Sequence, residues 1–254
     1  MEFLANAFNS ILYQPLFNAL VLLYEYLPGH DFGIAVIVLT VLIRLIFFPL
    51  MAKSIKSQKA LSEIQPKIQE IQQKYKNDKE KQAKATMELY KKAKINPFGG
   101  CLPLLIQLPI LFAIYRVFWK GLEPAQLSYL YSFIPNPGTI NPVFLGIVNL
   151  SQANLVLAIL AGILQFFQTK MMVPSQIAAS GSKQKNAKKG IPDFQGMMQK
   201  QMTYFFPVFT VFILWKLPSA IGIYWIVSAF FSIIQQHFIF SVKSEPTLEG
   251  KVKI

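Results

Sequence analysis

The chain has 254 residues, of which 53% are hydrophobic, and its mean hydropathy is +0.39. This apolar content is concentrated in long runs, which favours a lipid bilayer over a soluble core. A single cysteine (Cys101) excludes an internal disulfide framework. The two histidines (His30 and His237) lie near the ends of predicted spans, no Ser-His-Asp constellation is evident, and the ligands are too few for a catalytic metal site. We therefore expect neither an enzyme nor a resident metal or cofactor. The net charge of +13 is compatible with binding to nucleic acid, with binding to anionic lipid or with control of membrane topology. The distribution of the charges along the chain distinguishes these three functions.

The N-terminal segment, residues 1–30, predicts an amphipathic helix that lies in the outer membrane interface. Leucines recur along one side of the helical wheel and polar residues along another, and Pro28-Gly29 ends the pattern. The alternative is a further membrane span. No positively charged start typical of a cleavable signal peptide is evident. Residues 31–52 then predict span one, whose apolar run from Phe32 to Ala52 is interrupted only by Arg44 and a late Pro49.

Residues 53–96 predict a cytoplasmic hairpin of two antiparallel helices. The segment is rich in lysine, yet apolar side chains recur in it at spacings of three and four. This seam comprises Leu61, Ile64, Ile68, Ile71 and Tyr75. Asn77-Asp78 is a plausible turn, and we expect Ala83, Met87 and Tyr90 to continue the seam on the return helix. Most of the lysines are explained by a helix face that is exposed to water.

The rest of the chain alternates between apolar runs and polar connections. We predict span two at 97–120, an external loop at 121–151, span three at 152–173, a cytoplasmic linker at 174–200, span four at 201–217, span five at 218–240 and a cytoplasmic tail at 241–254. Lys216 and Pro218 divide the last long run into two crossings. Cys101, at the start of span two, reads as a close-packing residue and not as a reactive thiol.

The charges set the expected orientation. The hairpin, the linker and the tail hold most of the lysines, whereas the external loop and the N-terminal segment hold almost none. By the positive-inside rule the lysine-rich side is cytoplasmic, with the N-terminus outside. We therefore expect an all-α integral membrane protein with five transmembrane helices, whose charge reflects topology and not specific nucleic-acid binding.

Arg44 is the one charge inside the first predicted span. It precedes Lys53 by nine residues, about 13 Å along a straight helix. Burying an arginine there costs about 2.5–3.5 kcal/mol. No Asp or Glu lies inside the apolar runs of the five predicted spans, because Glu25, Asp31 and Glu123 all lie at the external side. Either backbone and amide groups satisfy it in a sealed core, or it lines a hydrated cavity, which we favour. The polar candidates for such a cavity are Gln107, Gln165, Gln168, Ser228, Ser232 and Gln235, although a single Gln in a span is more often an interhelical hydrogen-bonding residue.

Several sequence blocks closely resemble the YidC family of membrane protein insertases. They are the run Leu61–Tyr75, the block Met87–Tyr115 with its Asn-Pro-x-x-Gly-Cys-Leu-Pro motif, and Leu217–Trp225. The order of the predicted parts agrees as well, over residues 30 to 240. We expect a short bacterial form, without the large external domain of Gram-negative members and without a lipobox cysteine.

The resemblance implies a monomeric insertase and chaperone in the bacterial inner or plasma membrane. Its clients would be nascent membrane proteins, and the Sec translocon and the ribosome are candidate further partners, although the short tail weakens the case for strong ribosome attachment. The family's hydrophilic groove opens to the cytoplasm and to lipid and is closed outside. By resemblance Arg44, Gln168 and Trp225 would line it, with Gln165 as the alternative one turn away.

Three other functions compete with this interpretation. A secondary transporter predicts repeated halves and an intramembrane acid, and neither is found. A membrane-embedded enzyme lacks a catalytic set. A scaffold or assembly factor is hardest to separate, because chaperoning and insertion use the same surface.

Overall fold

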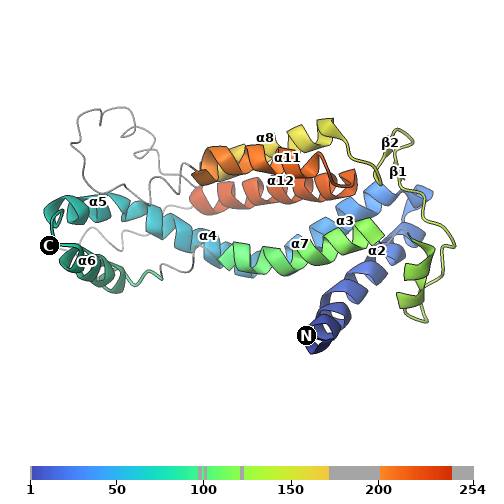
Figure 1. Cartoon of the computed structure of the whole chain (residues 1–254), viewed down its shortest axis with the longest axis horizontal. Helices are drawn as coiled ribbons and strands as arrows, with labels where there is room; N and C mark the ends of the chain where they lie inside the picture. Colours follow the sequence, from blue (N-terminus) through green and yellow to red (C-terminus); the bar gives the residue numbers. More distant parts are fainter. Residues whose placement is uncertain (1, 97–98, 100–101, 121–122, 172–200, 242–254) are drawn as a thin grey trace.

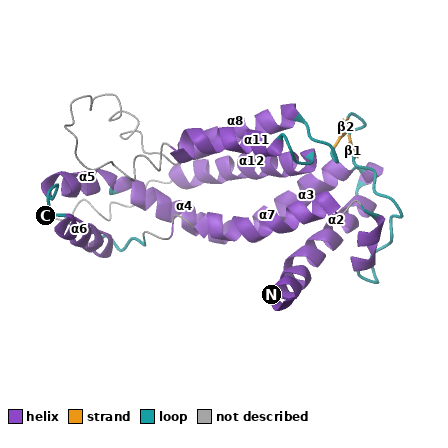
Figure 2. Cartoon of the chain, viewed as in Figure 1, coloured by secondary structure: helices purple, strands orange, loops and turns teal. Residues whose placement is uncertain are grey.

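The computed structural model is mostly helical and describes residues 2–96, 99, 102–120, 123–171 and 201–241. Figure 1 shows an elongated molecule in which α5 and α6 lie at one end and a bundle formed by α3, α7, α8, α11 and α12 occupies the rest. Figure 2 shows that the strands are confined to one short hairpin at the opposite end of the bundle. The Cys101 side chain, the 174–200 linker and nearly all of the 241–254 tail lie outside the described residues.

The N-terminal segment is helical and packs on the bundle by its second half. It consists of α1 (Glu2–Phe8), a π-helical stretch (Asn9–Tyr13) and α2 (Gln14–Tyr26), and it is inclined to the bundle in Figure 1. Phe17, Leu20 and Val21 are buried, and α2 contacts both α3 and α7. The helix ends before a short 3₁₀ turn, Pro28–His30, in which Gly29 has a φ of 83° that favours glycine.

The first predicted span is bent, contrary to the straight helix assumed from the sequence. Helix α3 (Phe32–Ile46) and helix α4 (Phe48–Glu63) meet at Phe47 with a bend of 65°. Pro49 lies in the first turn of α4, where it lacks an N–H to donate to the preceding turn, so the chain starts a new helix there. Helix α3 itself begins with Asp31, whose side chain accepts a hydrogen bond from the Ile34 N–H.

The hairpin is formed by the end of α4, α5 (Gln65–Lys74) and α6 (Lys79–Lys92). Its small core contains Ile64, Ile68 and Leu89, with Ile71 and Tyr90 packed against it. Leu61 and Tyr75 are only partly buried. The prediction for the return helix was wrong in part. On α6 the seam is formed by Leu89, with Tyr90 packed against it as expected, whereas Ala83 and Met87 are exposed. The side of α6 that faces α5 is therefore the side that carries Leu89 and not the side that carries Ala83 and Met87.

Helix α7 (Leu102–Lys120) leads into the loop at the far end of the bundle. The loop contains a 3₁₀ turn (Pro124–Tyr129) and an antiparallel pair of strands, β1 (Val143–Phe144) and β2 (Val148–Asn149), in which Phe144 opposes Val148. The remaining elements are α8 (Leu155–Met171), a π-helical turn (Gln201–Phe205), α11 (Phe206–Leu214) and α12 (Ser219–Ser241).

Within the described ranges, one helix is long and apolar enough to cross a membrane, namely α12, and the bent pair of α3 and α4 makes a second if counted as one span. Helix α8 and residues 201–214 are apolar but shorter.

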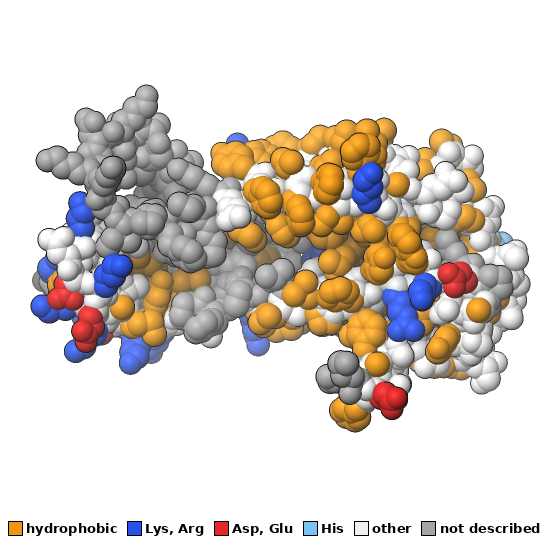
Figure 3. Space-filling model, viewed as in Figure 1, with side chains coloured by type: hydrophobic (Ala, Val, Ile, Leu, Met, Phe, Trp, Pro, Cys, Tyr) orange, Lys and Arg blue, Asp and Glu red, His pale blue; other side chains and the backbone are white. Residues whose placement is uncertain are grey.

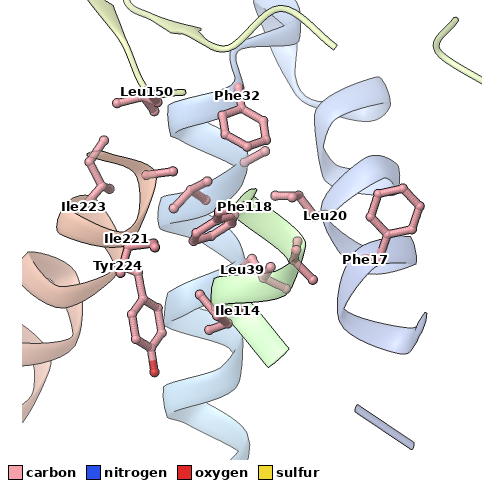
Figure 4. Packing of buried hydrophobic residues seen from close by; sticks show 14 of the residues in the cluster. Phe17, Leu20, Phe32, Leu39, Ile114, Phe118, Leu150, Ile221, Ile223 and Tyr224 are labelled. Carbon is pink, nitrogen blue, oxygen red and sulfur yellow. The ribbon is translucent and has the colours of Figure 1, made fainter. Parts of the chain in front are cut away.

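The core of the bundle lies where α2, α3, α7 and α12 meet. Figure 4 shows Phe32 and Leu39 of α3 facing Ile114 and Phe118 of α7, with Tyr224 of α12 alongside. These five side chains are almost fully buried. The core therefore fixes α3 and α12 relative to one another, and these two helices carry most of the polar candidates.

Candidate functional site

Arg44 occupies the last turn of α3, one turn before the bend at Phe47. Its side chain is partly exposed and not fully buried. No hydrogen bond or ion pair to Arg44 is found among the residues that the structure describes. Because the helix bends by 65° after Arg44, the depth of about 13 Å expected for a straight helix is an overestimate. Arg44 is thus a partly accessible cation without an internal counter-charge in the described part of the chain.

Helix α12 carries a buried polar stripe. It consists of Ser228, Ser232, Gln235 and Gln236, which recur four, three and one residues apart and so share one helical face. Gln235 Nε2 donates to the Phe48 carbonyl at 3.0 Å, just after the bend, and Phe48 makes an edge-to-face contact with the Phe231 ring. Within the described residues Ser228 Oγ and Gln236 Oε1 have no hydrogen-bonding partner, so these two buried atoms of the stripe remain available for hydrogen bonds.

The structure joins Trp225 to Gln165 and not to Gln168. The Trp225 Nε1–H donates to Gln165 Oε1, which links α12 to α8. Gln165 is buried, whereas Gln168 is only partly buried. The sequence-based alternative, one turn earlier, is therefore the residue in contact with Trp225.

Gln107 connects α7 to α12, since its amide donates to the Tyr224 hydroxyl. Sequence reasoning did not select Tyr224, although a tyrosine in an apolar run needs a partner for its hydroxyl, and that requirement was an available signal. With Trp225, two neighbouring residues of α12 thus reach amide side chains on two different helices.

The loop closes the end of the bundle opposite the hairpin. Asp31 Oδ2 accepts from the Leu145 N–H at 2.6 Å, and any side chain at Gly33 would collide with the Phe144 ring. On the other side, the Asn18 side chain donates to the Tyr129 carbonyl at 2.9 Å and accepts from the Tyr131 N–H at 2.7 Å. The sequence indicated only an external loop at 121–151, since none of these pairings follows from periodicity.

The hairpin differs from the bundle in its charges. A hollow of about 300 Å³ between α5 and α6 is lined by Ile71 and Leu89 together with lysines and glutamates. Burial raises the pKa of Tyr90, and hydrogen bonds from Lys81 lower the pKa of Asp78. Among the residues described, no group of His, Cys, Asp and Glu could hold a metal ion.

Comparisons with known proteins match most of the chain. The family described as "60Kd inner membrane protein" matches residues 22–246. A membrane protein insertase YidC of Fusobacterium nucleatum is 37% identical over 209 residues, which are 82% of this chain and 86% of that protein. Proteins of the same description from Geobacter metallireducens and Syntrophus aciditrophicus are 35% and 36% identical over 91% and 89% of this chain. The chain spans only 37% and 36% of the length of those two relatives.

Proposed function

This chain belongs to the YidC family of membrane protein insertases, a family of inner membrane proteins, and from that premise we propose that it guides nascent transmembrane segments into the bilayer along a polar groove that contains Arg44. The observation that carries the proposal is the state of Arg44, which is partly exposed, cationic and without an acidic partner in the described part of the chain. Gln107, Gln165, Gln168 and Trp225 are the further residues that we assign to the groove.

The proposed architecture is five spans at 31–52, 97–120, 152–173, 201–217 and 218–240. Residues 1–30 form an external interfacial helix, 121–151 an external loop, and 53–96, 174–200 and 241–254 the cytoplasmic parts. The distribution of lysines supports this orientation. The hydrogen bonds of Asp31 and Asn18 to the loop support a groove that is closed on the outer side.

Electrostatics gives the groove its selectivity in this proposal. Two opposite charges 4 Å apart attract by about 4 kcal/mol at an effective dielectric constant of 20, and by about 1 kcal/mol in bulk water. The free-energy cost of moving a client's acidic N-terminal tail into the membrane is therefore lower when the tail lies near Arg44. The apolar part of the client then moves into lipid along α8 and α12, and no covalent bond changes.

The hairpin captures the client first in this scheme. Its core is small and its surface carries many lysines. In the seam, Ile64 and Ile68 are buried and hold the hairpin together, whereas the partly buried Leu61, Ile71 and Tyr75 offer apolar contacts to a client. The Sec translocon and the ribosome are candidate partners of the same cytoplasmic side. A protein monomer suffices for all these steps.

Reconstituted insertion with substitutions at Arg44 tests the proposal. For a client with an acidic tail, Arg44→Ala should lower the insertion rate by about tenfold, which corresponds to about 1.4 kcal/mol. Arg44→Lys should retain most of the rate, because the charge and not the guanidinium shape is required. The matched control is the same client with its tail acids changed to amides, for which Arg44→Ala should change the rate little. An unchanged rate for the acidic client would overturn the mechanism.

Deletion of residues 61–90 separates capture from insertion. We expect crosslinking of a ribosome-bound client to fall, while a client delivered in detergent still inserts. If Arg44→Ala and the deletion both leave insertion intact but impair the folding of clients, the protein is a chaperone or scaffold and the insertase proposal fails.

A further inference from the structure

One face of α7 is apolar, exposed and aligned. Leu105, Leu108, Phe112 and Trp119 are exposed by 61%, 41%, 62% and 48%. At 3.6 residues per turn these positions, together with those of Arg116 and Lys120, fall within an arc of about 120°. The opposite face of the same helix is buried through Ile114 and Phe118, so this arc faces away from the protein core.

Two cations end this face, four residues apart. Arg116 is partly buried: its guanidinium lies 4.4 Å from the centre of the Tyr13 ring, and one of its amino groups donates to Asn9 Oδ1. That bond uses one donor of the five that a guanidinium carries. Lys120 is exposed, and in the described part of the chain its side chain makes no hydrogen bond or ion pair. In Figure 3, basic side chains (blue) gather on the visible face near the right-hand end of α7.

The local charge is positive even when the nearest acid is counted. Glu123 follows in the chain and is exposed, but no ion pair joins it to Arg116 or Lys120 within the described residues. Two cations against one carboxylate leave a net charge of +1. Positive charges are unfavourable on the outer side of a bacterial membrane protein, so a pair on one helical turn is costly to place there.

The apolar and cationic parts match the dimensions of one lipid molecule. Trp119 stacks with Tyr115 at a centroid distance of 5.5 Å, the amphipathic ring pair that is typical of the headgroup level. Phe112 and Leu108 lie eight and twelve residues before Lys120, or about 12 and 18 Å along the helix. Half of a bilayer's hydrocarbon core is about 15 Å thick, so an acyl chain that begins at Trp119 passes Phe112 and ends close to Leu108.

We propose that this face of α7 binds an anionic phospholipid, whose phosphate lies between Arg116 and Lys120 and whose acyl chain runs over Phe112 and Leu108. The occupant is anionic because a zwitterionic headgroup would leave the net positive charge uncompensated. The inference goes beyond insertion and depends only on α7 crossing the membrane, not on the role of Arg44.

The test is the thermal unfolding of the full chain in mild detergent with added phosphatidylglycerol or phosphatidylcholine. We expect phosphatidylglycerol to raise the unfolding temperature of the wild type in a concentration-dependent manner, because a ligand of the folded state stabilises it by mass action. Phosphatidylcholine should raise it less. Lys120→Gln should remove the difference between the two lipids, and Lys120→Arg should keep it. The matched control is Lys216→Gln, which removes an exposed lysine that lies over the Trp215 ring on a different element.

Four results would overturn the proposal. Equal stabilisation by the two lipids would show that the cations select no headgroup. A lipid preference of Lys120→Gln equal to that of the wild type, or an equal loss in Lys216→Gln, would show that the site is not on α7. Inorganic phosphate that reproduces the whole effect of phosphatidylglycerol would show a free-anion site without a role for the apolar face. A loss of insertion activity in Arg44→Ala bears on none of these outcomes.

Discussion

The bundle and the hairpin are both made of helices, but they differ in the polar side chains that they bury and in the side chains that they expose. In the bundle, buried polar groups are amides and hydroxyls, and many bond across helices, as Trp225 does with Gln165 and Gln107 with Tyr224. In the hairpin, the buried core is small and the described surface is dominated by lysine and glutamate. The bundle also exposes large apolar side chains such as Phe112 and Phe209, which the hairpin largely lacks.

The difference shows what each solvent requires. In the proposed arrangement the bundle lies in lipid, which offers no hydrogen bonds, so most polar side chains there pair inside the protein and apolar ones can face outward. Water satisfies charged side chains, so the hairpin needs only a narrow seam to hold its helices together. The bundle should therefore be sensitive to packing and to paired amides, and the hairpin to its few apolar contacts and helix caps.

The largest expected effect comes from overpacking the bundle at Gly162. A side chain there would collide with the Val211 side chain and would lie 3.2 Å from the Pro207 carbonyl oxygen, so α8 and α11 would have to separate. We expect Gly162→Leu to lower the stability of the bundle by about 3 kcal/mol, measured as a fall in its unfolding temperature in detergent. Ile163→Leu, at an exposed neighbour, is the control and should have little effect. An unfolding temperature for Gly162→Leu equal to that of the wild type would contradict close packing of these helices.

The next effect should be confined to the hairpin. Ile68 is 1% exposed, and Ile68→Ala should cost about 2 kcal/mol, at the low end for such a truncation because the surrounding core is small. Limited proteolysis should then cleave the hairpin faster, while the unfolding temperature of the bundle stays the same. Met87→Ala serves as the control, because Met87 is exposed. If Ile68→Ala destabilised the bundle equally, the two regions would not be independent.

A smaller effect tests the amide pairs of the bundle. Trp225→Phe leaves the buried Gln165 oxygen without its donor and should cost about 1 kcal/mol. The double variant Trp225→Phe with Gln165→Leu should recover part of this loss, since neither partner is then left unpaired. A double-mutant cycle of unfolding temperatures measures this coupling, and strictly additive effects would exclude it.

The smallest effect concerns the start of α6. Asp78 accepts a hydrogen bond from the Lys81 N–H at 3.0 Å, which holds the pKa of the Asp78 carboxyl below its usual value. Because its pKa is lower in the folded state, the cap stabilises α6 above a pH of about 3.9 and is lost as the pH falls through the folded-state value. The hydrogen-exchange protection of the Lys81 amide should fall over that range in the wild type. Asp78→Ala should show low protection and no such pH dependence.

The sequence predicted the helical class and the family, because long apolar runs and a specific motif are local signals. The contact of Trp225 with Gln165 was harder to predict, since its register depends on how α8 packs on α12. The partial exposure of Arg44 and the bend at Phe47 depend on neighbouring helices. The exposure of Met87 shows the same limit in the hairpin, where spacing alone could not determine which side of α6 faces α5.

The bend at Phe47 also has a mechanical consequence. Helix α4 has 16 residues, so it is about 24 Å long, and each degree of rotation at the bend moves its far end sideways by about 0.4 Å. A straight helix would transmit a force from the hairpin along its own axis. The bent helix would instead rotate about the bend, where Gln235 contacts Phe48. A rotation next to Arg44 would therefore move the hairpin much further than it moves Arg44, and a force on the hairpin would act on the bend as a torque.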